Sequence, residues 1–148
     1  MIKQTPEGQM FSDIVVDIFK LSGLLVAEGD RLTKEIGLTS ARWKVLGALA
    51  ISGKPMSVAQ IARTMGQTRQ GVQRITDVMA KEGIVIYQDN PQHKRAKLTL
   101  LTSKGKKTYS MLEEIQKPWA NTIIADMSLE DMETTLRVLR RIIQRCDP

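Results

Sequence analysis

The 148-residue sequence is poor in the residues that most catalytic and metal-binding sites need. It contains a single cysteine, Cys146, a single histidine, His93, and no glycine-rich loop of the kind that cradles phosphates. One cysteine excludes an intramolecular disulfide and a thiolate metal cluster. With so little material for catalysis, we expect neither an enzyme nor a bound cofactor or metal.

Long hydrophobic runs are also missing. The longest apolar stretch, residues 14–27, is interrupted by Asp17 and Lys20, so no membrane span is expected. The first residues lack the apolar run of a secretory signal. Together with the lone cysteine, these features favour a protein of the reducing cytoplasm that does not act on a membrane.

Aromatic residues number only six, so aliphatic side chains and eight methionines must fill the core. A hydrophobic content of 42% over this length suffices for one compact domain, or for one domain with helical extensions.

Positive charge is concentrated in one quarter of the chain. Residues 68–108 contain nine Lys or Arg and three Asp or Glu, a net charge of +6, whereas the remaining residues contain thirteen of each sign. Such a concentration suggests nucleic acid or an anionic surface as partner, although many basic faces are only solvated.

Both ends of the chain predict helices that need cover. Residues 11–27 are apolar on nearly all faces, and Gly29-Asp30 is interpreted as the break after them. Residues 103–125 predict a second helix, which Pro118 should kink or interrupt. A third helix begins at Ser128 and carries an apolar seam at helical spacing, formed by Leu129, Met132, Leu136, Leu139, Ile143 and Cys146. An intramolecular helix pair would also explain the seam, but together these helices favour a homodimer, with residues 10–28 and 103–146 as the dimerisation helices.

The middle of the chain contains a helix-turn-helix pattern. Ser57 and Gln60 form a capping box that starts one helix, Gly66 ends it, and Thr68 caps the next. Ala62 is small enough for the two helices to cross closely, as a helix-turn-helix requires. An ordinary helical hairpin is the alternative.

The second helix and the segment after it carry the polar residues. Arg69, Gln70, Gln73 and Arg74 lie away from the apolar face, and Arg and Gln form paired hydrogen bonds with guanine and adenine in the major groove. Strands are expected at residues 84–88 and 97–102, and the turn between them carries His93, Lys94 and Arg95. A helix-turn-helix followed by such a hairpin is a winged helix, here over residues 39–102, whose tip cations would meet DNA phosphates.

These motifs resemble the multiple-antibiotic-resistance regulator (MarR) family of transcription factors. The likeness extends from about Phe11 to Arg145 and is most specific at residues 38–43, 57–75, 79–84 and 98–105. It implies an obligate dimer, a winged-helix reader and a palindromic operator, and many members release DNA when a small anionic or phenolic compound binds. The family's wing usually carries Asp-x-Arg. Here Arg95 matches the arginine that enters the groove, and His93 replaces the aspartate that anchors the wing.

The sequence therefore predicts a mainly α protein with a small β-wing, a single MarR-like chain in which a winged helix-turn-helix is flanked by N- and C-terminal dimerisation helices. Its function is predicted to be sequence-specific binding of double-stranded operator DNA, as a repressor that a small-molecule effector releases. The alternative is a winged-helix interaction module that binds a protein or a surface without specific DNA binding. The predicted DNA-binding residues are Ser57, Thr68, Arg69, Gln70, Gln73, Arg74, His93, Lys94 and Arg95.

Overall fold

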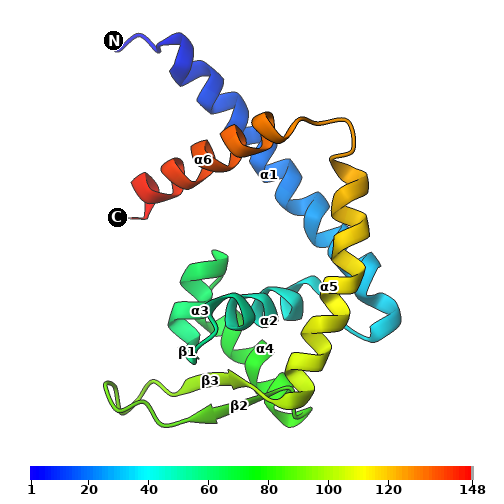
Figure 1. Cartoon of the computed structure of the whole chain (residues 1–148). Helices are drawn as coiled ribbons and strands as arrows, with labels where there is room; N and C mark the ends of the chain where they lie inside the picture. Colours follow the sequence, from blue (N-terminus) through cyan, green and yellow to red (C-terminus); the bar gives the residue numbers. More distant parts are fainter. Residues whose placement is uncertain (148) are drawn as a thin grey trace. The chain divides into compact units, whose positions relative to one another are not determined.

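A computed structural model describes residues 1–147 of the chain, and its architecture is mainly helical with a small sheet, as predicted (Figure 1). The elements in chain order are α1 (Pro6–Thr33), η1 (Lys34–Ile36), α2 (Ser40–Ser52), β1 (Met56–Ser57), α3 (Val58–Met65), α4 (Arg69–Lys81), β2 (Val85–Gln88), β3 (Leu98–Leu101), α5 (Ser103–Ile123) and α6 (Leu129–Cys146). The chain divides into two compact units, residues 1–115 and residues 116–148. No helix within the described residues combines the length and apolar content that crossing a bilayer requires.

Side-chain caps define the helix starts that the sequence predicted. Ser57 Oγ accepts a hydrogen bond from the backbone N–H of Gln60 (3.2 Å), and Gln60 Oε1 accepts one from the N–H of Ser57 (2.8 Å), which completes the capping box. Thr68 and Ser128, at the other two predicted starts, each accept one bond from the first turn of their helices, and Thr39 caps α2 in the same way. The predicted stop at Gly66 is also confirmed, because this residue adopts the left-handed conformation with φ of 62°.

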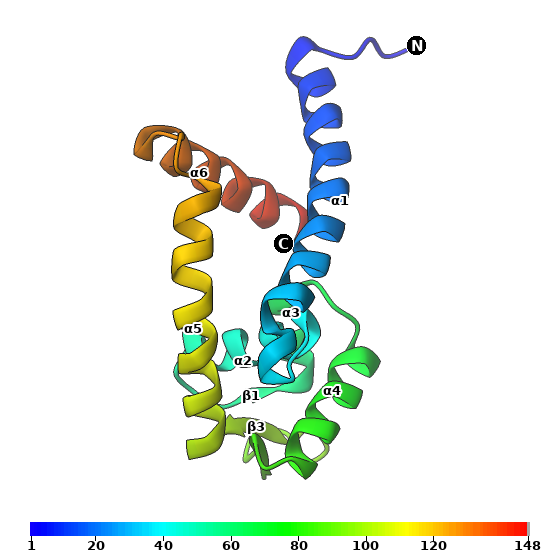
Figure 2. The ribbon, with the colours of Figure 1, turned by 90° about the vertical axis from the view of Figure 1, so that its right-hand side faces the viewer.

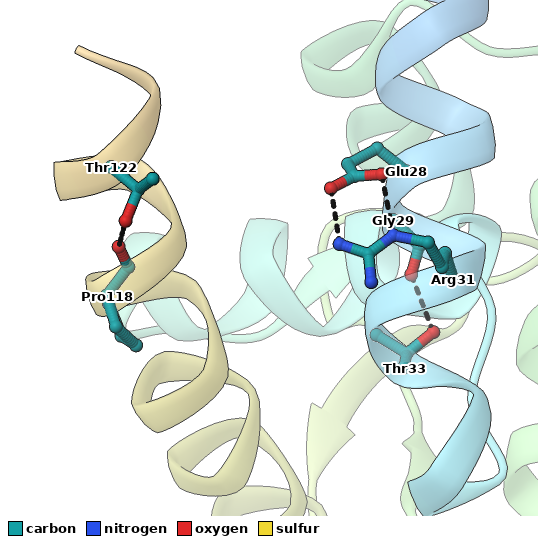
Figure 3. Close-up of polar contacts among 6 residues, drawn as sticks. All are labelled: Glu28, Gly29, Arg31, Thr33, Pro118 and Thr122. Atoms are coloured by element: carbon teal, nitrogen blue, oxygen red, sulfur yellow. Dashed lines mark hydrogen bonds and ion pairs between the residues drawn. The ribbon is translucent and has the colours of Figure 1, made fainter. Parts of the chain in front are cut away.

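The predicted break at Gly29-Asp30 is wrong, because α1 continues to Thr33. The two residues instead hold the start of α2 against α1. A Cβ at position 29 would collide with Ser40 Oγ, so glycine is needed for close approach, and Asp30 Oδ1 accepts a hydrogen bond from the N–H of Ser40 (2.7 Å). Thr33 Oγ1 donates to the carbonyl of Gly29 (2.8 Å) within the last turn (Figure 3).

The core of the first unit lies between α2, α3, α4 and the sheet. Leu46 of α2, Ile61 of α3 and Val72 and Met79 of α4 are fully buried there, so the apolar faces of these helices point inward. The sheet has three antiparallel strands in the order β1-β3-β2, one strand more than the sequence predicted. Strand β1 is only two residues long and pairs with residues 98–99 of β3, so it has no pattern of its own.

Helix α5 begins in the first unit and runs through Pro118 to Ile123 in the second, so the interruption considered for this proline does not occur. Proline removes one N–H from the helix ladder but leaves its own carbonyl, which here accepts a bond from Thr122 Oγ1 (2.9 Å) (Figure 3). Helix α6 follows with no buried side chain among its residues, and Leu129 and Ile143 of its seam are 75% and 60% exposed. Cys146 is exposed as well.

Helix α1 also exposes large apolar side chains. Among the residues of this helix only Gly29 and Thr33 are buried. Phe19 is 72% exposed, Val16 66% and Leu24 56%. In the single chain this helix therefore leaves its apolar faces uncovered, as its composition predicted.

Candidate nucleic-acid interface

Helix α4 exposes one polar face while its opposite face is buried. Val72, Thr76 and Met79 are fully buried against the core, and Arg69, Gln70, Gln73 and Arg74 are exposed. The turn at Gly66 brings α3 beside α4 within the first unit (Figure 2). The exposed face is thus the one that the sequence predicted.

The wing is an antiparallel hairpin whose tip is held by backbone turns. Strands β2 and β3 pair from Val85 opposite Leu101 to Gln88 opposite Leu98, and the loop extends away from the helices (Figure 1). The carbonyl of Asn90 accepts a bond from the N–H of His93 (3.1 Å), and its side chain accepts one from the N–H of Gln92 (3.1 Å). A local Asx turn therefore orders the tip without the aspartate that is usual in the family.

Helix α4 and the wing enclose a hollow of about 980 Å³, which we call the α4–wing groove. It is lined by Ser57, Val58, Ala59, Arg69, Gln70, Gln73, Arg74, Asp77, Tyr87, Arg95, Ala96 and Lys97. Six of the nine predicted DNA-binding residues thus share one concave surface. The other three, Thr68, His93 and Lys94, are exposed beside it, Thr68 as the cap of α4 and the other two at the wing tip.

The groove carries an excess of positive charge. Arg69 and Arg74 from α4 face it together with Arg95 and Lys97 from the wing, and Asp77 is the one acidic residue in its lining. The N-terminus of α4 adds the positive end of a helix dipole on the same side. Such a surface attracts phosphate groups.

Asp77, Tyr87 and Lys97 were not predicted from the sequence. Lys97 lies at the end of the basic run that the sequence showed, and its charge was the available signal. Asp77 follows Gln73 by one helical turn, and Tyr87 is the half-buried residue between the exposed Ile86 and Gln88 of β2. Helical spacing indicates which side of α4 carries Asp77, and strand alternation indicates which side of β2 carries Tyr87. Only the fold shows that these two sides face each other.

A hydrogen-bond network joins α4 to β2 at the floor of the groove. Tyr87 Oη donates to Asp77 Oδ1 (2.7 Å) and lies 2.7 Å from Thr76 Oγ1. Gln73 Nε2 donates to Asp77 Oδ1 (2.9 Å) and to Tyr87 Oη (3.2 Å). The bonds from Tyr87 and Gln73 lower the pKa of Asp77. Burial, reinforced by the Asp77 carboxylate, raises the pKa of Tyr87 to about 12.

The raised pKa makes the stability of the protein depend on pH in the alkaline range. An unfolded tyrosine ionises near its ordinary pKa of 10.0, whereas folded Tyr87 keeps its proton up to about 12. This contribution is fully present below pH 10 and is lost as the pH rises to about 12. Urea unfolding of the parent and of Tyr87→Phe should therefore show a difference in stability that shrinks across this interval. Tyr109, whose pKa is also raised, is present in both proteins, so its contribution cancels in the difference. A difference in stability that stays constant over this pH interval would contradict the raised pKa of Tyr87.

Helix α4 is also braced at its C-terminal end. Arg42 of α2 donates from both terminal nitrogens to the two carboxylate oxygens of Glu82 (2.8 and 3.0 Å). Lys104 of α5 donates to the carbonyl of Glu82 (2.8 Å). A two-point bond between a guanidinium and a carboxylate fixes direction as well as distance, so the helix is held in a defined orientation.

No cluster of three or more potential metal-ligating His, Cys, Asp or Glu side chains occurs among residues 1–147.

Comparison with known proteins identifies relatives along most of the chain. The MarR family matches residues 36–96. An uncharacterised protein of Mycobacterium tuberculosis is 32% identical over 130 residues, which cover 88% of this chain and 90% of that protein. The transcriptional activatory protein BadR of Rhodopseudomonas palustris is 26% identical over 129 residues, 85% of this chain and 74% of BadR.

Solved structures agree with this assignment of fold. The crystal structure of the transcriptional regulator PA3341 has a TM-score of 0.81 at 25% identity, and the match covers 90% of this chain and 98% of that one. The S. aureus MepR–DNA complex has a TM-score of 0.74 at 18% identity, with 88% and 95% covered. Because the sequence relatives, the family match and the fold coincide, the chain belongs to the MarR family of winged helix-turn-helix transcription regulators.

Proposed function

We propose that the protein is a sequence-specific DNA-binding regulator that acts as a homodimer on a palindromic operator in the cytoplasm. The observation that carries the proposal is the α4–wing groove, in which the exposed side chains of α4 and the cations of the wing converge on one concave surface. A major-groove helix flanked by a basic wing is the arrangement with which winged helices contact a duplex. MepR, whose fold is similar, is described in complex with DNA.

The groove residues divide by chemistry into two groups. Arg74, Gln70 and Gln73 lie on the outer face of α4, where side chains of these types contact base edges. Arg95, Lys97 and Ser57 lie on the wing and at the start of α3, where they would contact phosphates and fix the position of α4. Arg69, in the first turn of α4, and the neighbouring Thr68, His93 and Lys94 would contact the flanking backbone.

A homodimer gives the exposed apolar helices their cover. In the single chain Phe19 and Val16 of α1, and Leu129 and Ile143 of α6, are all more than half exposed. Apolar surface of this extent on separate helices is typical of interfaces between subunits. A two-fold axis through such an interface would place two α4 helices in successive major grooves, about 34 Å apart.

Two further parts of the proposal rest on the family resemblance. These are repression of the target genes and release of DNA by a small anionic or phenolic ligand. BadR, which is 26% identical, is named as an activatory protein, so activation is the alternative to the proposed repression. The position of the operator decides between them, because a site that overlaps a promoter blocks polymerase and a site upstream allows recruitment.

Selection from a library of random DNA duplexes tests the proposal. At moderate salt and with excess unrelated DNA, the protein is expected to enrich an inverted repeat whose half-sites are centred about 10 base pairs apart. Sedimentation should give twice the chain mass of 16.6 kDa. Enrichment of no motif, together with no mobility shift on any promoter, would favour the interaction module, in which the basic face binds a protein or a surface.

A further inference from the structure

We propose that Tyr87 and Asp77 are positioning residues that fix the side-chain amide of Gln73 in one orientation, so that Gln73 presents only its carbonyl oxygen to DNA. Gln73 would then accept a hydrogen bond from the exocyclic amine of either adenine or cytosine, instead of forming the paired contact with adenine that the sequence suggested. This inference rests on the proposed function and specifies its base preference.

The orientation of the amide follows from the chemistry of its partners. An ionised carboxylate accepts hydrogen bonds and donates none, so the group that faces Asp77 Oδ1 at 2.9 Å must be the amide nitrogen of Gln73. The lowered pKa of Asp77 keeps that carboxylate ionised at neutral pH. The carboxylate of Asp77 therefore decides that the nitrogen end of the Gln73 amide points inward.

Tyr87 Oη is a second acceptor for the same nitrogen. Its phenol has one proton, which goes to the carboxylate of Asp77 at 2.7 Å because the carboxylate can only accept. The phenol oxygen is then left to accept from Gln73 Nε2 at 3.2 Å. Thr76, which is fully buried, lies 2.7 Å from the same phenol oxygen and fixes its position.

The amide nitrogen of Gln73 thus already donates to two acceptors within the protein. The paired contact with adenine needs a proton of this nitrogen for N7 of the base and the carbonyl oxygen for the N6 amine. In this network only Oε1 of Gln73 remains for a base edge, since it takes part in none of the four bonds. Adenine N6 and cytosine N4 both donate in the major groove, whereas guanine O6 and thymine O4 accept and would face this oxygen unfavourably.

The expected base preference is therefore broad at one operator position. Adenine and cytosine should bind within about threefold of each other, and both should exceed guanine and thymine by roughly tenfold, the effect of a single hydrogen bond. A free amide able to form the paired contact would instead prefer adenine over cytosine by roughly tenfold or more.

The experiment measures binding to operators that differ at single positions. The operator is first selected with the parent protein, and the position that loses its preference in Gln73→Ala is the one that Gln73 contacts. The adenine-to-cytosine affinity ratio at that position is then compared between the parent and the Tyr87→Phe/Asp77→Ala double variant. The ratio is unaffected by the general gain in DNA affinity that removal of an acidic residue causes. Tyr109→Phe, which alters the chain's other tyrosine outside the groove, is the matched control.

In the double variant the amide is released, and the ratio is expected to rise about tenfold towards adenine, while Tyr109→Phe keeps the parental ratio. Tyr87→Phe alone should raise the ratio about threefold and serves if the double variant does not fold. The inference is overturned if the parent already selects adenine alone, if Gln73→Ala changes no position, or if the ratio is unchanged in folded variants. Enrichment of no motif by the parent protein would instead overturn the proposed function, and the inference with it.

Discussion

Replacement of Gly105 by alanine is expected to lower the free energy of unfolding by about 3 kcal/mol and the melting temperature by roughly 10 °C. Gly105 is a buried residue in the first turn of α5. A Cβ at this position would overlap the carbonyl oxygen of Ile84 and would lie 3.3 Å from Leu101 Cδ2. An overlap with backbone cannot be relieved by a rotamer change, so one of the two elements must move.

The carbonyl of Ile84 is poorly placed to move. It accepts hydrogen bonds from the N–H and the hydroxyl of Thr102, both at 3.1 Å. Thr102 Oγ1 in turn accepts from the N–H of Gly105 (3.0 Å) and so starts α5. Displacement of Ile84 would therefore weaken the start of β2 and the cap of α5 together. Alanine favours a helix over glycine by about 1 kcal/mol, which is too little to offset this loss.

Gly47→Ala provides the matched control for this prediction. Gly47 is also a buried helical glycine of the first unit, but the nearest atom to an added Cβ is the mobile end of Met65 at 3.9 Å. Its replacement is expected to be neutral or to stabilise by up to about 1 kcal/mol. Urea unfolding of both variants at one protein concentration checks the pair. Equal stability of Gly105→Ala and the parent would show that β2 and α5 approach each other less closely than described.

Features that depend on neighbouring residues were predictable from the sequence. The capping box of Ser57 and Gln60 and the left-handed stop at Gly66 depend only on residues within one or two turns. The residue types at these positions were therefore enough to predict them. The apolar spacing of α4 likewise fixes which side is buried, and therefore which side carries Arg69 and Arg74.

Features that depend on distant residues were not predictable in this way. Gly29 looks like a helix break in isolation, but its partner Ser40 lies eleven residues later and requires the absence of a side chain. Strand β1 exists only because β3 offers it an edge. The predicted break at Gly29 and the missed strand β1 have the same origin. A local pattern cannot show whether a glycine or a two-residue segment ends an element or makes a tertiary contact.

The site shows the same division between local and distant information. Pattern alone identified the polar residues of α4 and the basic wing, and it gave Gln73 a free amide. The partners that engage this amide, Asp77 and Tyr87, come from the helix itself and from a strand fourteen residues away. The residue types on the exposed face of α4 were therefore predictable, but the hydrogen bonds that Gln73 makes within the protein were not.

Arg95→Ala is expected to weaken operator binding roughly 30-fold, which corresponds to about 1 kcal/mol lost at each of the two wings of a dimer. Arg95 lines the α4–wing groove opposite the polar face of α4, where its guanidinium would contact phosphate or enter the minor groove. Removing one cation from each subunit should also reduce the slope of log K against log salt by about 2, since each lost phosphate contact releases one condensed counterion less.

Lys94→Ala tests whether the position of the cation on the wing matters, or only its charge. Lys94 precedes Arg95 on the same exposed tip, so the two variants lose the same formal charge, but Lys94 does not line the groove. If the wing acts only as a diffuse positive field, both variants should lose affinity equally. If Arg95 makes a defined contact in the groove and Lys94 only an exposed contact with the flanking backbone, Lys94→Ala should lose no more than about threefold in affinity. It should also reduce the slope by less than Arg95→Ala does. Mobility shifts on the selected operator over a range of salt concentrations distinguish the two cases. Equal losses of affinity would mean that the wing contributes only a general electrostatic attraction for DNA. Sequence recognition would then depend on α4 alone.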